Sequence, residues 1–146
     1  TRKAPYEFGW DWGPRFVTCG IWRPVMVKAW DDVKIDDFQI FQQHVLDSLA
    51  ALKAVATIFS DVPKRVKLKL YNGENQLKQR EIALHKGLNR INMKFFINHP
   101  KRWWTNGLGE AHLYRFSVRL QKQGQKIDEK ITRFGIRTLQ IVQKPD

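Results

Sequence analysis

Through most of the chain, apolar and polar residues alternate with the two-residue period of half-buried β-strands. The clearest example is the segment 66–71, Val-Lys-Leu-Lys-Leu-Tyr, which the turn signal Asn72-Gly73 follows. This pattern predicts strands over residues 33–40, 49–59, 66–71, 77–84, 91–97, 114–120, 127–131 and 136–142. A change of phase between Ile35 and Phe38, within the first strand, predicts a β-bulge.

The segment 49–59 has two interpretations, because its Ala, Leu and Lys residues are also good helix formers. Its residues Val55, Thr57 and Ile58 favour a strand. With this segment assigned, the chain contains seven or eight short strands, turn signals between them and no convincing helix. The sequence therefore predicts an all-β fold, an immunoglobulin-like antiparallel β-sandwich over residues 31–140. The Cys–Trp–Cys pattern of antibody domains is absent from it.

The first thirty residues do not fit inside this sandwich. Val25 and Val27 alternate with their neighbours as in a strand, but the segment 16–30 has no partner strand of its own. A sheet of fewer than about three strands is not independently stable. We therefore expect residues 1–30 to be the end of a preceding domain whose body is missing, with residues 1–15 poorly ordered. The chain also starts without an initiating Met, so we expect a piece of a longer protein.

The composition supports a packed core, since 42% of the residues are hydrophobic and 12% are aromatic. The formal net charge of +12 would fit a nucleic-acid-binding protein. Lys and Arg are, however, scattered singly along the alternating segments, as on a solvated sheet face, so we expect no nucleic-acid partner. No apolar run approaches the roughly 20 residues that span a bilayer, and we expect no membrane partner either.

The sequence predicts no metal site and no cofactor. Cys19 is the only cysteine, which excludes an intrachain disulfide and a thiolate cluster, and its strand-like surroundings predict a small buried thiol. The histidines lie far apart, without helical pairing, at His44, His85, His99 and His112. The carboxylates Glu7, Asp11 and Glu110 show no spacing that would hold two of them at a fixed separation, as glycoside hydrolysis requires. We therefore expect no catalytic residue in this chain.

Residues 8–15, Phe-Gly-Trp-Asp-Trp-Gly-Pro-Arg, are unusual because two indoles flank a carboxylate between glycines. Gly, Pro and Asp all disfavour the interior of a strand. Flat aromatic faces beside a hydrogen-bonding carboxylate suit a sugar, whose C–H faces are apolar and whose hydroxyl rim is polar. Trp10, Asp11 and Trp12 are therefore candidate sugar-binding residues. A Gly/Pro turn whose Trp rings pack on a neighbouring sheet would explain the same residues.

Residues 103–109, Trp-Trp-Thr-Asn-Gly-Leu-Gly, form a second unusual stretch, at a place where a simple sandwich needs only a short loop. Paired indoles in a Gly-rich loop are a liability on a surface unless something covers them. Trp103, Trp104 and Asn106 are therefore candidates for contact with a neighbouring domain. The alternative is a loop that folds back over its own sandwich.

Four groups of residues, in this order along the chain, resemble the glycoside hydrolase family 2 enzymes and, among them, the β-mannosidases. Residues 2–6 with 8–15 resemble the β-mannosidase version of a loop near the end of the sugar-binding domain. Residues 20–25, Gly-Ile-Trp-Arg-Pro-Val, resemble the strand that ends the family's jelly roll. Residues 103–109 resemble a segment usually written Trp-Trp-Pro-Asn-Gly, with a Thr in place of the Pro. Residues 133–138, Arg-Phe-Gly-Ile-Arg-Thr, look like the strand that leads into the catalytic barrel.

The resemblance implies a division of the chain into three parts. Residues 1–30 would be the end of the jelly-roll sugar-binding domain, residues 31–140 the immunoglobulin-like sandwich, and residues 141–146 the lead into a missing (β/α)₈ barrel. The family's two catalytic Glu residues lie on that barrel, one of them in an Asn-Glu pair. This chain contains no Asn-Glu dipeptide, so the resemblance implies an inactive part of a glycosidase.

For the whole protein, the resemblance implies a retaining exo-β-mannosidase that removes terminal β-linked mannose from oligosaccharides, without a metal. The segment Trp10-Asp11-Trp12 would line the subsite for the terminal mannose, and Asp11 would accept hydrogen bonds from sugar hydroxyls. The compartment stays open, with extracytoplasmic, periplasmic or lysosomal locations suggested by the family. A β-galactosidase or β-glucuronidase parent and a free-standing carbohydrate-binding sandwich are the alternatives.

Overall fold

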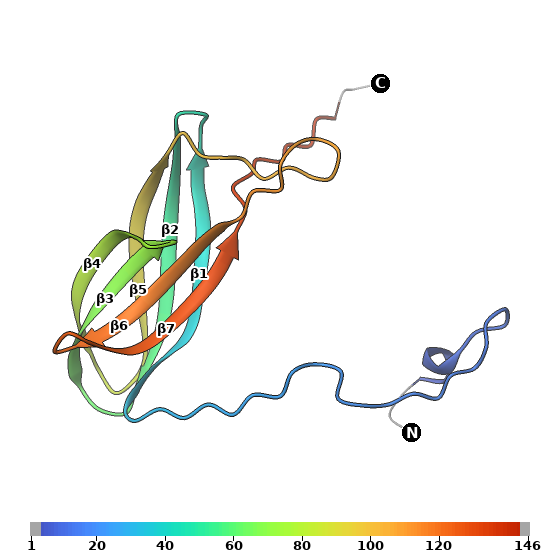
Figure 1. Ribbon diagram of the computed structural model, residues 1–146, viewed down its shortest axis with the longest axis horizontal. Coiled ribbons are helices and arrows are strands. Elements are labelled where there is room, and N and C mark those ends of the chain that lie inside the picture. The colour runs from blue at the N-terminus through green and yellow to red at the C-terminus, as the bar shows by residue number, and fades with distance from the viewer. Residues whose placement is uncertain (1–3, 144–146) are drawn as a thin grey trace.

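Seven strands form two antiparallel sheets in the computed structural model, which describes residues 4–143 (Figure 1). One sheet has the order β1-β2-β5 and the other the order β4-β3-β6-β7. The strands are β1 (Val33–Val45), β2 (Leu49–Ser60), β3 (Lys64–Asn72), β4 (Asn75–Leu84), β5 (Gly87–Asn98), β6 (Tyr114–Lys122) and β7 (Gln125–Phe134). The predicted all-β, immunoglobulin-like sandwich is thereby confirmed.

The ambiguous segment 49–59 forms strand β2, as predicted. It is the central strand of its sheet and is paired along one edge with β1 and along the other with β5. Its inward side chains, which include Ala54, Ala56 and Ile58, are fully buried. Hydrogen bonding on both edges and burial of one face outweigh the helix propensity of Ala and Leu, because propensity is a weak preference that tertiary contacts override.

The predicted bulge in β1 is also present, because the pairing register between β1 and β2 shifts between Ile35 and Asp37. A shift of the pairing by one residue would normally turn every following side chain from the core face of the sheet to the solvent face. The extra residue at the bulge compensates for the change of phase in the sequence. Val33 and Ile35 before the shift and Phe38 and Ile40 after it therefore all enter the same core.

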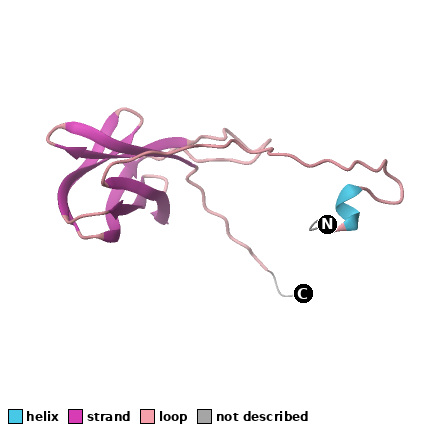
Figure 2. Cartoon of the chain, turned by 90° about the horizontal axis from the view of Figure 1, so that it is seen from below, coloured by secondary structure: helices cyan, strands magenta, loops and turns pink. Residues whose placement is uncertain are grey.

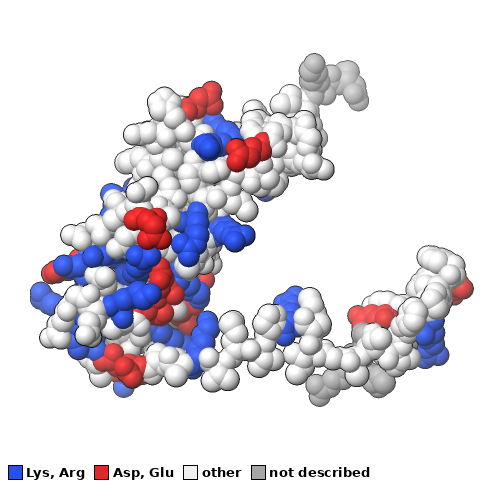
Figure 3. Space-filling model, viewed as in Figure 1, with Lys and Arg blue, Asp and Glu red and all other residues white. Residues whose placement is uncertain are grey.

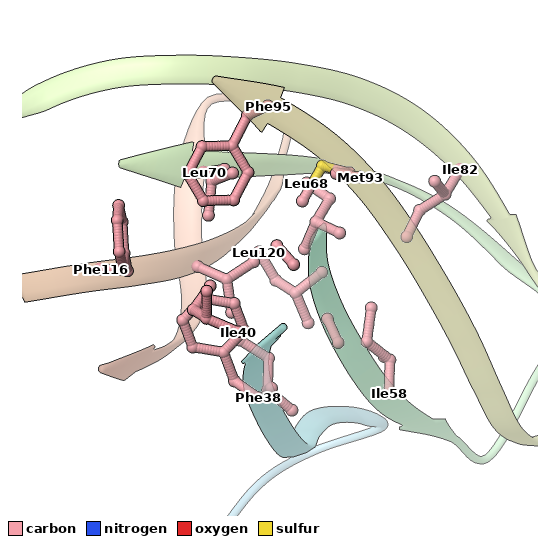
Figure 4. Packing of buried hydrophobic residues seen from close by; sticks show 14 of the residues in the cluster. Phe38, Ile40, Ile58, Leu68, Leu70, Ile82, Met93, Phe95, Phe116 and Leu120 are labelled. Carbon is pink, nitrogen blue, oxygen red and sulfur yellow. The ribbon is translucent and has the colours of Figure 1, made fainter. Parts of the chain in front are cut away.

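Both sheets contribute large side chains to this core (Figure 4). Phe95 on β5 and Phe116 on β6 meet edge to face, with ring centroids 5.2 Å apart and planes inclined by 69°. This geometry is the one that aromatic quadrupoles favour. Because β5 and β6 belong to different sheets, the pair joins the two layers.

Two-residue turns close the hairpins of the second sheet. In the β6–β7 hairpin, Gln123 and Gly124 both have positive φ angles, of 49° and 83°, as a type I′ turn requires. In the β3–β4 hairpin, only Gly73 has a positive φ, of 57°, and its N–H donates to the Arg115 carbonyl at 2.9 Å. The Asn72-Gly73 turn signal is thereby confirmed as a hairpin whose turn is also bonded to β6.

Lys and Arg are spread over the visible face of the sandwich and alternate with Asp and Glu (Figure 3). Some of these charges are paired across strands: Arg119 Nε on β6 donates to Glu129 Oε1 on β7 at 2.6 Å. This hydrogen bond lowers the pKa of Glu129, and Lys126, 3.0 Å from the other carboxylate oxygen, acts in the same direction. No helix in residues 4–143 is long and apolar enough to cross a membrane.

The predicted strand over residues 136–142 is wrong, because β7 ends at Phe134 and no strand follows it within the described chain. Ile136 is nevertheless fully buried, and its carbonyl accepts a hydrogen bond from Trp103 N at 2.9 Å. The Ile136 carbonyl is thus bonded to a loop rather than to a strand ladder. Beyond it, Leu139 and Ile141 are exposed, so their alternation has no face to bury.

The N-terminal arm, residues 4–32, extends away from the sandwich (Figures 1 and 2). It contains one short 3₁₀ helix, η1 (Pro5–Phe8), and no strand. Side chains on both sides of the strand-like segment are exposed, including Val25, Met26 and Val27, and the exposed fraction of Val27 is 97%. The expected buried thiol is wrong: Cys19 is exposed, because the arm has no neighbouring strand to cover it.

Candidate functional site

The Trp10 loop, residues 8–16, is closed by two backbone hydrogen bonds near the free end of the arm. Phe16 N donates to Phe8 O at 2.8 Å, and Gly13 N donates to Trp10 O at 3.0 Å. The second bond defines a tight turn with Asp11 and Trp12 as its two central residues. The loop therefore presents these two side chains at its tip.

Glycine is required at position 9 for this closure. Its φ is +154°, and a Cβ there would lie 3.1 Å from Arg15 Cα and 3.3 Å from the Pro14 carbonyl oxygen. Such contacts are tighter than side chains normally tolerate, so a larger residue would push Gly9 away from Pro14 and Arg15 on the opposite side of the loop. The sequence signal for this close approach was the glycine beside the Trp-Asp-Trp run.

The Trp10 and Trp12 rings stand edge to face, with centroids 5.9 Å apart and planes inclined by 64°. They are 55% and 86% exposed, so they do not pack on a sheet of this chain. Among the described residues, none hydrogen-bonds the Asp11 carboxylate. A hollow of about 540 Å³ is lined by Tyr6, Gly9, Trp10, Asp11 and Arg15. The loop thus presents aromatic faces, a carboxylate and a guanidinium to solvent, which is the mixture that a sugar can use.

The Trp103 loop, residues 103–111, is the second candidate site and projects from the end of the sandwich (Figure 1). Trp103 pairs with Ala111 in an isolated bridge, and Trp104 N donates to Glu110 O at 3.0 Å. At the tip, Leu108 N donates to Thr105 O at 3.1 Å. The loop is therefore an ordered hairpin and does not fold back over the faces of the two sheets.

The Trp103 loop packs against residues 135–139, which follow β7. A Cβ on Gly135 would lie 2.8 Å from both Cβ and Cγ of Trp103, so only glycine permits this contact. The Arg137 guanidinium lies 5.0 Å from the centroid of the Trp103 ring, within cation–π range. On the other side, Gln42 of β1 binds the Arg137 backbone twice, donating to its carbonyl at 2.7 Å and accepting from its N–H at 3.3 Å. Two stretches far apart in sequence are thereby brought together.

A pocket of about 280 Å³ lies between the Trp103 loop and residues 137–139. Its walls include both indoles of the loop, Leu108 and Leu139, and on the other side the Arg102–Asp47 ion pair, whose Nη2–Oδ1 distance is 2.9 Å. The sequence had indicated the indoles, and the segment 133–138 that contains Arg137, but not Asp47 or Arg102. Isolated charged residues of this kind carry no pattern that would have distinguished them from a solvated sheet face.

The two candidate sites lie apart in this chain, one on the arm and the other at the end of the sandwich (Figure 1). The carboxylates considered above are divided between them: Glu7 and Asp11 lie in the arm, whereas Glu110 lies in the Trp103 loop beside His112, at 3.7 Å. Within residues 4–143, no three His, Cys, Asp or Glu side chains converge as a metal site would require.

Comparison with known protein families shows to which family the chain belongs. The family described as "Glycosyl hydrolases family 2" matches residues 33–137, which contain the whole sandwich, the Trp103 loop and the segment packed on it. The chain belongs to glycosyl hydrolase family 2. A second description, "Glycosyl hydrolase 2 galactose-binding domain-like", matches residues 1–23, which contain the Trp10 loop. The predicted family is therefore confirmed.

Within family 2, the chain is similar to β-mannosidases. It is 35% identical to Beta-mannosidase B from Aspergillus clavatus, a match that covers 99% of this chain and 17% of that protein. The structure of Beta-D-Mannosidase from Dictyoglomus thermophilum superposes with a TM-score of 0.74 at 29% identity, over 95% of this chain and 18% of that one. The chain thus spans about 17% of the length of the fungal relative.

Other family 2 structures share the fold at lower identity. An exo-chitosanase from Amycolatopsis orientalis superposes with a TM-score of 0.66 at 20% identity, over 80% of this chain and 14% of the exo-chitosanase. A likeness at this level of identity concerns the fold alone. The greater coverage and identity of the mannosidase structure extend the similarity into the N-terminal arm.

Proposed function

We propose that this chain is the non-catalytic part of a retaining exo-β-mannosidase that removes terminal β-linked mannose from oligosaccharides. The observation that carries the proposal is the 35% identity with a fungal β-mannosidase along 99% of this chain. The parent would use two barrel carboxylates through a glycosyl-enzyme intermediate. The chain has no Asn-Glu dipeptide, and the spacing of its carboxylates along the sequence indicates no such pair. Its role would be to position substrate and to support the barrel.

The Trp10 loop would line the subsite for the terminal mannose. The open hollow beside Asp11 and the carboxylate without a hydrogen-bond partner among the described residues support this role. Asp11 would accept hydrogen bonds from hydroxyls remote from the scissile bond, and Trp10 and Trp12 would wall the ring and exclude water. Contacts of this kind orient the sugar for attack rather than break the bond.

The Trp103 loop would meet the catalytic barrel. The loop that carries Trp103, Trp104 and Asn106 projects from the end of the sandwich at which the chain leaves it (Figure 1). The exposed Trp104 and Leu108 beside the pocket form an apolar surface that a neighbouring domain could cover. In this proposal, residues 1–30 complete a jelly-roll domain, residues 31–140 are the sandwich, and residues 141–146 lead into the barrel.

The proposal predicts activity for the whole protein and none for this chain. The full-length parent should release nitrophenol from an aryl β-mannoside much faster than from the matching β-galactoside or β-glucuronide. Purified residues 1–146 should release none above background, because the barrel carboxylates are absent. Turnover by the 146-residue chain that survives repurification would contradict its non-catalytic role, and a preference of the parent for galactoside or glucuronide would contradict the mannosidase assignment.

The proposed domain division predicts the order of proteolysis in the 146-residue chain. Trypsin should cut first after Arg15 and Lys28, which lie in the exposed arm, because backbone outside a sheet enters a protease site easily. Lys53 and Lys94 lie opposite each other in paired strands and should be cut much later. N-terminal sequencing of the early fragments measures this order. Early cleavage inside β2 or β5 would show that the sandwich is not the stable unit.

A further inference from the structure

The chain contains two Asn-Gly steps, Asn72-Gly73 and Asn106-Gly107, in very different surroundings. Asparagine is chemically labile in proteins. In deamidation, the backbone nitrogen of the next residue attacks the side-chain amide carbon, the C–N bond to the amide nitrogen breaks, and ammonia leaves with the transferred proton. Water then opens the resulting succinimide to aspartate or isoaspartate. Glycine as the next residue favours the step because it has no Cβ to obstruct the approach and is conformationally free.

The Asn106-Gly107 step lies at the exposed tip of the Trp103 loop. The bond from Leu108 N to Thr105 O, with Gly107 at a φ of +82°, closes a turn of type II in which Asn106 and Gly107 are the central residues. Among the described residues, no hydrogen bond holds the Gly107 N–H, which is the attacking nitrogen. A Cβ built on Gly107 would meet no atom within 4 Å, so the space around the step is open.

The Asn72-Gly73 step is held by the second sheet. Asn72 is half-buried in β3 and is paired with Phe116 on one side and with Asn75 on the other. Its attacking nitrogen, Gly73 N, donates to the Arg115 carbonyl at 2.9 Å. Succinimide formation here would require the end of β3 to open from both of its neighbours, whereas at Asn106 it requires opening of one turn. Local opening is rarest where a segment is most extensively hydrogen-bonded.

We infer that Asn106 is a site of spontaneous deamidation in this chain and that Asn72, with the same dipeptide sequence, is protected by the sheet. The products place a carboxylate, or in isoaspartate an additional backbone methylene, between Trp104 and Leu108 at the tip of the loop. The inference rests on the geometry of this chain alone and does not depend on the proposed enzymatic function.

The test is incubation of the folded 146-residue chain at mildly alkaline pH, followed by tryptic peptide mapping. The peptide 103–115 contains Asn106 as its only amide side chain, so the mass gain from replacement of NH₂ by OH is unambiguous. The peptide 70–78 reports on Asn72 after fragmentation separates it from Asn75 and Gln76. Conversion at Asn106 should be faster by roughly tenfold or more, the factor that an additional opening cost of about 1.4 kcal/mol would give.

Two controls distinguish structure from sequence. In strong denaturant the two sites should convert at similar rates, because the dipeptides are the same and the sheet is lost. The variant Gly107→Ala should slow conversion in peptide 103–115 under both conditions. Equal rates in the folded chain, or conversion at Asn106 only after denaturation, would overturn the inference.

Discussion

In the full-length parent, Asp11→Ala should lower kcat/KM for an aryl β-mannoside by about 30- to 1,000-fold without unfolding the protein. Loss of a charged hydrogen-bond partner to a buried sugar hydroxyl costs roughly 2–4 kcal/mol, and about 1.4 kcal/mol corresponds to tenfold in rate. The expectation follows from the position of Asp11 at the tip of the Trp10 loop, beside the hollow lined by Trp10 and Arg15. The loss should persist with a simple aryl leaving group, because Asp11 would contact the terminal mannose.

The matched control is Glu7→Ala, which removes another exposed carboxylate of the arm that does not line the hollow. Its kcat/KM should stay close to that of the parent. Kinetics and thermal melting should be measured on the same preparations, because a purely structural role for Asp11 predicts a lower Tm with nearly normal kinetics. An Asp11→Ala enzyme with unchanged kcat/KM and an unchanged Tm would show that the loop does not reach the sugar.

The second large effect is on stability. In the 146-residue chain, Phe95→Ala should lower the free energy of unfolding by about 3–5 kcal/mol, the usual cost of emptying a phenylalanine site in a core. Phe95 is 2% exposed and contributes one of the two rings that join the sheets. Because a domain of this size is stable by only about 5–15 kcal/mol, the variant should unfold at much lower urea concentration or fail to fold.

The neighbouring residue is the control. Phe96 follows Phe95 on the same strand but points to the opposite face and is 59% exposed. Phe96→Ala should change the free energy of unfolding by less than about 1 kcal/mol. Urea unfolding of both variants, monitored by tryptophan fluorescence, measures the difference. Equal losses from the two variants would mean that the alternation in β5 does not define which side of the strand faces the core.

The sandwich was largely predictable because its strands, with the exception of the edge strand β7, bury one face. Period-two alternation identified β3, β5 and β6, and the change of phase between Ile35 and Phe38 identified the bulge. Alternation alone failed at residues 136–142, where the same pattern occurs without a strand. A strand requires a neighbour to receive its hydrogen bonds, and no residue pattern within one segment reports whether that neighbour exists.

The sequence predicted which stretches of the chain form the candidate sites, but it did not predict the contacts that these stretches make. Two indoles around Asp11 identified the Trp10 loop, and the Trp103-Trp104 pair identified the second loop. The contact between Gly135 and Trp103 was not foreseen, because it depends on the path that the chain takes after β7. Cys19 was misjudged for a related reason: its neighbours have the composition of a strand, but burial requires a second layer that this chain does not supply there.

The number of strands determines how far the N-terminal arm must extend to bring the Trp10 loop to the end of the sandwich at which the chain leaves. Seven antiparallel strands carry the chain in at one end of the sandwich and out at the other, so the start of β1 at Val33 and the end of β7 at Phe134 lie at opposite ends of the domain (Figure 1). The 13 residues of β1 make that length about 40 Å at roughly 3.3 Å per residue. The segment 17–32, drawn out at about 3.4 Å per residue, spans at most about 55 Å. The segment 17–32 is therefore long enough to lie alongside the sandwich and bring the Trp10 loop to the end at which the chain leaves, with little length to spare.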